Sequence, residues 1–582
     1  MKTEKKFLKT DAFVMIVLFA VSFILHMILS FPISKGTLIN GDAMKYLKYS
    51  FQWVTEGKQL AYHYPPIYPL SLVPAYLFKD VNLAVRVINQ IYASTSIMYV
   101  YLIAKLFINK KASILVALMS LALPYQFISP SQTMSENIYF PLLLLTIWYL
   151  MRPYKEEWEI GRRICNDLVL SAMIMGLYLT RYITLVIIPV FAFVWVMKQI
   201  DNKYKFREVF TRADFIVQAM FLLWLPWYLI CRSNGYNLKE TMGFGIASKP
   251  YPEQLTKGRL LMVFIMYVAY FLILAAPVLF AMFKSLCTLN FKSLCCKFNR
   301  FMVLIYGMAA AFLVAVTRHS WRVAYNYPNF QRVMGRYLIY FPLLFILVAM
   351  VTIAERKNRE LKDNLVADII FLVVSLGLTI GAYLIDIESL IYEIPSTFAT
   401  WKAASDMYIV MYNRRTWLII ALIVIVLTFV IMRIKTEAVA HNREAVLAVL
   451  IVVFFAFFMP GYYKFYCEKY HELGVEYTED LNEILIRENL FSEVEGLKVR
   501  VYFDVDDKVN TTYEGYNLQY YRTNSQYKIM DHIEDAVEEV GYYVVVVNEN
   551  NKDKYASKLI YEMGTYERFD ETDAVLLVKN YN

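Results

Sequence analysis

An aspartate shortly after the first apolar run is the side chain best placed to do chemistry. Asp42 stands in Asn40-Gly41-Asp42-Ala43, a short way beyond an apolar run that ends at Phe31. At a membrane surface such a carboxylate can act as general base on a substrate hydroxyl while a lipid-borne reactant stays in the bilayer. The alternative from the residues alone is that Asp42 caps a helix over 43–54.

Several arginines stand where a charge needs a partner. Arg181 interrupts an apolar run, and Arg318, Arg322, Arg332 and Arg336 crowd one loop between two apolar runs. Charges at such places are costly unless they meet a counter-charge or line a polar cavity. A lipid phosphate would supply that counter-charge, because guanidinium binds phosphate oxygens bidentately. The alternative is that these side chains simply reach the lipid headgroups.

Two further ionisable residues and a group of aromatic residues leave more than one interpretation open. Lys45, three residues after Asp42, could bind phosphate or pair with Asp42. Glu136 opens an apolar segment, where an acid offsets the helix dipole with Ser135 or Thr133 as the cap. His63 lies in Tyr62-His63-Tyr64-Pro65-Pro66-Ile67-Tyr68, where it could orient an acceptor or only pack. The prolines predict a rigid, extended wall here.

The elements that must position these residues are membrane helices. The chain of 582 residues is 58% hydrophobic and 19% charged, with a mean hydropathy of +0.42. A soluble protein would carry charge on about a quarter of its residues. Apolar runs long enough to span a membrane, or nearly so, recur about thirteen times, from 12–31 to 444–460. The predicted class is therefore mainly α and polytopic.

The connecting loops predict the orientation. Short basic loops, such as Lys110-Lys111 and 152–163, alternate with longer ones, so the positive-inside rule places the N-terminus in the cytoplasm. The first loop, 32–83, and the tail then lie outside. This alternation of inner and outer loops requires two helices over 167–198, broken at Arg181, because a single helix would put three basic loops outside. We predict the break.

The tail differs from the rest of the chain. Residues 461–582 hold 25 of the 50 acidic residues but only 13 of the 59 basic ones, so the basic excess belongs to loops between spans and nucleic acid is not an expected partner. Apolar runs at 498–503, 542–547 and 574–578 predict strands, with a helix such as 531–540 between them. We therefore expect two domains, a membrane domain over 1–460 and a small extracytoplasmic α/β domain over 461–582.

No metal site is legible. The cysteines lack a CxxC spacing, and Cys287 with Cys295-Cys296 has no accompanying histidine. Asp504-Val505-Asp506-Asp507 has the form of an acidic metal motif, but an acidic turn explains it as well. The sequence allows a divalent metal but does not indicate one, so we predict no cofactor.

The order of these features resembles the membrane glycosyltransferases of the GT-C fold, and most of all the bacterial aminoarabinose transferase and protein O-mannosyltransferase branch. The resemblance covers the membrane part, and its motifs are Gly41-Asp42, Tyr64-Pro65-Pro66-Ile67-Tyr68-Pro69-Leu70, Arg86-Val87-Ile88-Asn89, Met134-Ser135-Glu136-Asn137 and Gly335-Arg336-Tyr337-Leu338. It implies inverting transfer of a sugar from a polyprenyl-phosphate donor to an acceptor hydroxyl of a glycan or lipid at the outer face of a cell membrane, expected to be bacterial.

The resemblance also implies roles for residues. Asp42 becomes the general base and Glu136 a second acid facing the cavity. The donor phosphate falls to Arg336, Arg332, Arg181 and Lys45, and acceptor or sugar contacts fall to His63, Tyr64 and Tyr68. Two departures matter: Ala43 follows Asp42 where protein O-mannosyltransferases have Glu, and Tyr64 precedes Pro65-Pro66 where the aminoarabinose enzymes have Lys.

Two other classes compete with a transferase. A transporter or flippase of lipid-linked oligosaccharide would need charges deep in several helices and a repeated half-structure. No repeat is legible, and the apolar runs have few charges in their centres. A scaffold that only presents the tail would not need the ordered polar residues of the outer loops.

Overall fold

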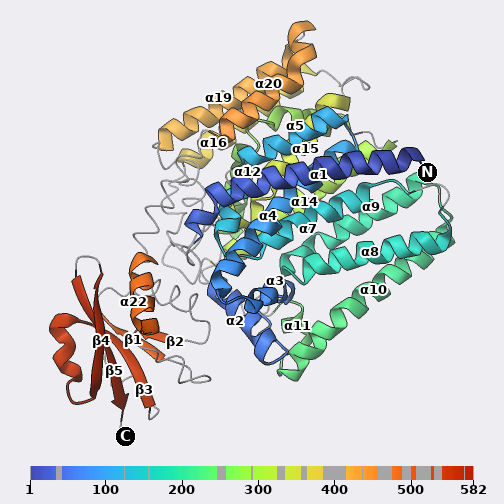
Figure 1. Ribbon diagram of the computed structural model, residues 1–582. Coiled ribbons are helices and arrows are strands. Elements are labelled where there is room, and N and C mark those ends of the chain that lie inside the picture. The colour runs from blue at the N-terminus through green and yellow to red at the C-terminus, as the bar shows by residue number, and fades with distance from the viewer. Residues whose placement is uncertain are drawn as a thin grey trace.

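A computed structural model gives the structure of the protein. It describes residues 2–34, 42–123, 125–154, 158–244, 257–289, 293–323, 335–355, 364–384, 414–434, 437–456, 475–487, 500–505, 526–529, 541–568 and 571–580. Long helices form most of it, and a sheet near the C-terminus lies at one end, beside a short helix (Figure 1).

The helices of the first half carry the candidate residues. They are α1 (Lys2–Leu29), α2 (Asp42–Thr55), α3 (Ile67–Leu72), α4 (Val81–Lys105), α5 (Lys110–Met119), α6 (Tyr125–Ile128), α7 (Glu136–Met151), α8 (Ile160–Tyr178), α9 (Ile188–Asp201), α10 (Phe206–Ser233) and α11 (Leu238–Thr241), with 3₁₀ turns η1 (Phe31–Ile33), η2 (Val73–Leu77), η3 (Ser120–Ala122), η4 (Ser129–Ser131) and η5 (Tyr182–Val186). Figure 1 shows the short α2, α3 and α11 together at one end of the long helices.

The second half packs against them. Its elements are α12 (Lys257–Leu274), α13 (Leu279–Cys287), α14 (Lys297–Val323), η8 (Gly335–Leu338), α15 (Phe341–Glu355), α16 (Leu365–Leu384), α19 (Arg414–Arg433), α20 (Glu437–Ala456) and α22 (Val475–Arg487). Residues 341–353 of α15 are all buried. A helix that is apolar all round is the centre of a core, so α15 is a central helix of the bundle.

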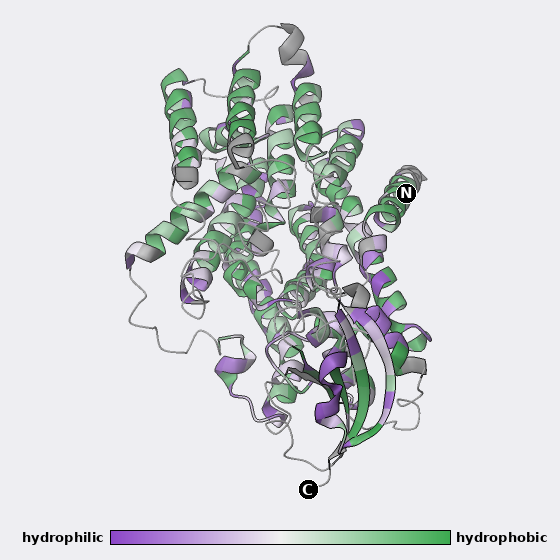
Figure 2. Cartoon of the chain, turned by 90° about the vertical axis from the view of Figure 1, so that its left-hand side faces the viewer, coloured by the Kyte–Doolittle hydropathy of each residue, from purple (hydrophilic) through white to green (hydrophobic). Residues whose placement is uncertain are grey.

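Length and composition allow several helices to cross a membrane. In the described part of the chain, four are long and apolar enough, namely Asp11–Leu29, Val81–Lys105, Phe206–Ser233 and Lys297–Arg322, and shorter apolar helices accompany them. Hydrophobic residues dominate the long helices (Figure 2). This agrees with a multi-pass arrangement, while the count of about thirteen spans stays a prediction.

Two of the predicted runs are broken in the structure. The run 260–283 divides into α12 and α13, with Pro277 between them. The run 112–128 divides into α5, η3 and α6. Proline lacks the N–H that a helix interior requires and disfavours helix in the residue before it. A hydropathy pattern alone does not show where a proline ends a helix.

The predicted break at Arg181 is confirmed. Helix α8 ends at Tyr178, Arg181 is extended (φ −151°, ψ 122°), and α9 begins at Ile188. The carboxylate of Asp167, in the first half of α8, accepts from Trp195 Nε1, in the second half of α9, at 3.0 Å. The two helices therefore run back on each other. A turn at Arg181 is required by the predicted orientation, in which two spans over 167–198 keep the basic loops on the cytoplasmic side.

A buried ion pair ties this hairpin to α10. Arg212 Nε donates to Asp167 Oδ2 at 2.6 Å, and Arg212 Nη2 donates to the Tyr154 hydroxyl at 2.9 Å. Both charged side chains are fully buried. Full pairing and additional hydrogen bonds are what make such burial tolerable. The network lies at the end of the hairpin remote from Arg181.

The predicted strands of the tail are confirmed as β1 (Arg500–Asp504), β3 (Gly541–Asn548) and β5 (Glu571–Asn580), joined by β2 (Gln526–Ile529) and β4 (Leu559–Arg568). The order is β2-β1-β3-β5-β4, with β1 parallel to β2 and β3, and β5 antiparallel to β3 and β4. Helix α22 covers one face through Leu481 and Leu485. The predicted helix 531–540 lies outside the described residues, and the division at 460/461 stays a prediction.

Candidate functional site

Asp42 is the first residue of α2, and its carboxylate is held by a neighbouring tyrosine. The Tyr64 hydroxyl donates to Asp42 Oδ1 at 2.5 Å. Asp42 is half-buried and stands in the first turn of α2, where the helix dipole favours a negative charge. Lys45 is exposed, and its ammonium lies 5.7 Å from the centre of the Tyr64 ring.

Glu136 and Arg181 form a buried ion pair. Glu136 is 2% exposed and Arg181 is 8% exposed, and Arg181 Nη1 contacts Glu136 Oε1. The Ser135 hydroxyl lies between them, 3.3 Å from Glu136 Oε2 and 3.2 Å from Arg181 Nη1. Ser135 stands at the N-cap of α7, but its side chain makes no capping hydrogen bond. The predicted capping role therefore does not apply to Ser135.

Tyr46 connects the aspartate to this pair. Its hydroxyl donates to Ser135 Oγ at 3.0 Å, and its ring meets the Tyr64 ring edge-on at 4.9 Å. Burial raises the pKa of the Tyr46 phenol; the Arg181 charge opposes that rise, and the charges of Asp42 and Glu136 add to it. All three charged groups therefore lie within electrostatic reach of one phenol.

Other residues of the first loop pack around Tyr46 and Tyr64. Tyr68 is fully buried, contacts the Tyr46 ring edge-on at 4.8 Å, and donates its hydroxyl to Asn89 Oδ1 at 2.9 Å. His63 is exposed, and its ring lies against Tyr62 at 4.6 Å. Of the predicted acceptor-binding residues, His63 and Tyr64 therefore lie on the accessible side, and Tyr68 packs beneath them.

The arginines of the second half reach the site only in part. Arg332 lies outside the described residues, and Arg336 lies in η8 with a side chain that is also outside them. Its neighbour Tyr337 is placed: the Arg181 guanidinium carbon lies 5.3 Å from the centre of the Tyr337 ring. The turn that carries Arg336 therefore lies beside Arg181. Arg318 is exposed and Arg322 is 7% exposed, both on α14.

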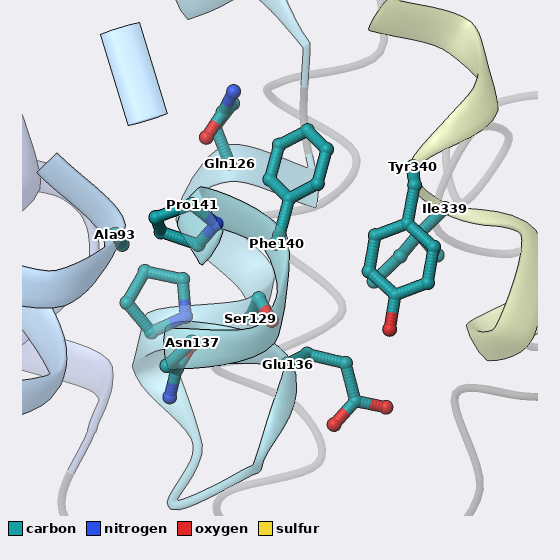
Figure 3. A pocket seen from close by; sticks show the side chains of 10 residues that line it. Ala93, Gln126, Ser129, Glu136, Asn137, Phe140, Pro141, Ile339 and Tyr340 are labelled. Carbon is teal, nitrogen blue, oxygen red and sulfur yellow. The ribbon is translucent and has the colours of Figure 1, made fainter. Parts of the chain in front are cut away.

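A small cavity borders Glu136. It is lined by Ala93, Gln126, Ser129, Pro130, Glu136, Asn137, Phe140, Pro141, Ile339 and Tyr340. In Figure 3 the Glu136 carboxylate and the Tyr340 hydroxyl extend toward the same side of this cavity. Elements far apart in sequence, α7 and the residues just after η8, thus face each other here. In the described part of the chain, no group of three His, Cys, Asp or Glu side chains could hold a metal.

The first loop is anchored to the α8–α9 turn and to α10. Ile67 N–H donates to the Leu179 carbonyl at 3.0 Å, and the Asn234 amide donates to the Gln59 carbonyl at 2.9 Å. The Tyr182 hydroxyl donates to the Tyr62 carbonyl at 2.9 Å and accepts from Trp227 Nε1 at 3.1 Å. Contacts between segments far apart in sequence therefore set the position of the loop.

One glycine tests this anchoring. Gly243 has φ +81°, and a Cβ built there would lie 2.6 Å from Tyr182 Cγ. We expect Gly243→Ala to displace the Tyr182 ring, to lower the thermal unfolding temperature and to increase proteolysis of the first loop. Gly235→Ala is the matched control, since Gly235 also has positive φ (+87°) but open space around it. Equal losses in the two variants would mean that only backbone strain counts.

Sequence reasoning missed Tyr46 and Tyr337 as parts of the site. Tyr46 follows Asp42 by four residues, the spacing that places two side chains on one helix face, and this signal could have found it. Tyr337 stands in the Gly335-Arg336-Tyr337-Leu338 motif, but the motif does not indicate its contact with Arg181, which joins segments more than a hundred residues apart.

Comparisons with known proteins identify the fold. Residues 65–227 match the model of the dolichyl-phosphate-mannose-protein mannosyltransferase family. That segment includes Glu136 and Arg181 and begins after Asp42 and Tyr64. No curated protein matches the chain in sequence.

Two solved structures resemble nearly the whole chain. The crystal structure of ArnT from Cupriavidus metallidurans bound to undecaprenyl phosphate is 12% identical and has a TM-score of 0.54, with 98% of each chain covered. The apo structure of the same protein is 11% identical and has a TM-score of 0.51, with 99% of this chain and 98% of that chain covered. The fold is therefore that of GT-C glycosyltransferases, and the family match supports a multi-pass membrane glycosyltransferase.

Proposed function

We propose that the protein transfers a sugar from a polyprenyl-phosphate donor to an acceptor hydroxyl of a glycan or lipid at the outer face of the membrane. One observation carries the proposal: Asp42 and the Glu136–Arg181 pair converge on Tyr46 and Ser135. A carboxylate base and a cation for a leaving phosphate are the two groups that this reaction needs. The bound undecaprenyl phosphate of the similar ArnT structure supports a donor of this kind.

In the proposed reaction Asp42 takes the proton of the acceptor hydroxyl. The acceptor oxygen attacks the anomeric carbon, and the bond from that carbon to the phosphate oxygen breaks. The lipid phosphate leaves with the electron pair, so a single in-line displacement inverts the anomeric centre. Because a phosphate leaves readily, its departure needs charge stabilisation more than a proton donor.

The cations near the site are proposed to stabilise the negative charge of the leaving phosphate. Arg181 contacts Glu136 in the structure, and we propose that Glu136 orients Arg181 toward the phosphate. Arg336, Arg332 and Lys45 are proposed to bind the donor phosphate as well. His63 and Tyr64 are proposed to contact the acceptor, while Tyr68, whose hydroxyl donates to Asn89, packs behind them. We also propose that the N-terminus lies in the cytoplasm and that the tail lies on the outer side of the membrane.

The experiment that tests this function compares cells with and without the protein. Mass spectrometry of lipid extracts should show a polyprenyl-phosphate hexose or pentose that accumulates when the protein is absent, together with an envelope glycan or lipid that lacks the sugar. A flippase would instead leave its lipid-linked oligosaccharide intact on the inner side of the membrane. Unchanged lipids and glycans would contradict the transferase.

A further inference from the structure

The hydroxyl of Tyr64 is placed on the carboxylate of Asp42 from a separate segment of the chain. Its oxygen lies 2.5 Å from Asp42 Oδ1, at the short end of the range for a hydroxyl that donates to a charged acceptor. Asp42 begins α2, whereas Tyr64 comes from a stretch of bends before α3, not from the extended segment that the prolines predict. Neither residue therefore sets the position of the other through local backbone geometry.

Several contacts hold the Tyr64 ring. It meets the Tyr46 ring edge-on at 4.9 Å and the Tyr49 ring at 5.9 Å, so α2 itself forms the surface on which it packs. Edge-on aromatic pairs at such distances are favourable beyond simple burial. With only two side-chain torsions to fix, the phenol is held in place at small entropic cost.

The backbone of Tyr64 is held as firmly as its ring. The fully buried Gln59 amide donates to the Tyr64 carbonyl at 2.7 Å and to the Ala61 carbonyl at 2.6 Å. Pro65 and Pro66 follow directly and restrict the backbone further. The Tyr64 hydroxyl, which donates the hydrogen bond to Asp42, is thus held in place before any ligand binds, as a preorganised site requires.

A fixed phenol in this position affects a carboxylate in two ways. A hydrogen bond to the charged form favours ionisation, so Asp42 stays a base at lower pH. The bond also fixes the rotation of the carboxyl group, and a carboxylate with about four acceptor sites can still take a proton from an acceptor hydroxyl.

We propose that Tyr64 is a positioning residue, which holds Asp42 ionised and in one orientation through its hydroxyl. The inference rests on the proposed function and deepens it, since it assigns how the base is prepared. Five other titratable groups lie around Asp42 and Tyr64. Lys45 and Tyr49 lie on the same helix as Asp42, and Tyr46 connects this helix to Arg181 and Glu136.

The first test needs no donor. In the full chain in lipid nanodiscs, the infrared carboxyl band that is lost in Asp42→Asn reports the titration of Asp42. We expect Tyr64→Phe to move its midpoint to higher pH by about one to two units. Tyr76→Phe is the matched control, because that hydroxyl donates to the Leu47 carbonyl of α2 at 3.1 Å. An unmoved midpoint in Tyr64→Phe, or an equal shift in Tyr76→Phe, overturns the proposal.

The second test measures transfer from undecaprenyl-phosphate mannose in membranes that contain the full chain and the cellular acceptor. Tyr64→Phe should lower kcat about 10- to 100-fold with little change in KM, and should move the acidic limb of the pH profile to higher pH. In an Asp42→Asn background it should add nothing. Additive losses overturn the proposal. If the infrared midpoint moves and neither this donor nor the lipid that accumulates in cells supports transfer, the proposed function itself fails.

Discussion

Replacement of Asp42 by asparagine is expected to lower the rate of sugar transfer by about 100- to 10,000-fold, the range for loss of a general base. An asparagine has nearly the same shape, and its carbonyl oxygen can still accept from the Tyr64 hydroxyl, which donates to Asp42 Oδ1 at 2.5 Å. The amide oxygen is far too weak a base to take the acceptor proton. The measurement is transfer per molecule of protein in membranes, with the folded amount quantified.

The matched control lies in the same loop. Asp80 caps α4 by accepting from the Leu83 N–H at 2.8 Å, and asparagine caps a helix about as well as aspartate. Asp80→Asn should therefore keep wild-type transfer and stability. Full transfer by Asp42→Asn would exclude Asp42 as the base and leave it as a residue of the first helical turn.

Removal of one partner of the Glu136–Arg181 pair is expected to destabilise the protein by about 3–5 kcal/mol. Both side chains are buried, so Glu136→Gln leaves a guanidinium without its counter-charge. The thermal unfolding of the purified full chain measures the loss. Binding of undecaprenyl phosphate, measured on the same sample, should weaken as well, because Arg181 would no longer be oriented toward the phosphate.

The double variant Glu136→Gln with Arg181→Met separates these two effects. Removing both charges should restore much of the stability, whereas phosphate binding and transfer should stay lost. An exposed pair supplies the control: Lys552, in the turn between β3 and β4, and Glu562, in β4, lie 3.4 Å apart and are more than a third exposed, so Glu562→Gln should change neither property. A double variant that transfers sugar normally would contradict the role of Arg181.

Local sequence patterns predicted much of the fold. The strands β1, β3 and β5 follow short runs of β-branched and aromatic residues, and the turn at Arg181 follows from the charge of the loops around it. The predicted limits were wrong where a proline divided an apolar run, as between α12 and α13, because hydropathy measures burial and not backbone hydrogen bonding.

The candidate site was only half visible in the sequence. Glu136 and Arg181 are charges at the ends of apolar segments, where placing them is costly, and Asp42 follows the first apolar run in the first loop. The partner of each charge was not predicted. The pairing of Glu136 with Arg181 and the turn from Arg181 back into α9 depend on how α7, α8 and η8 pack.

The sequence by itself determined that this is a chain of apolar helices with Asp42 near the first of them and a mixed α/β tail at the end. Composition and periodicity are enough for this, because they act within a single segment. Only the tertiary structure decided that Tyr64 donates to Asp42 and that Tyr46 and Ser135 connect Asp42 to Arg181. These hydrogen bonds join segments 22 to 89 residues apart, and such contacts exist only once the long helices have packed and brought the short ones together.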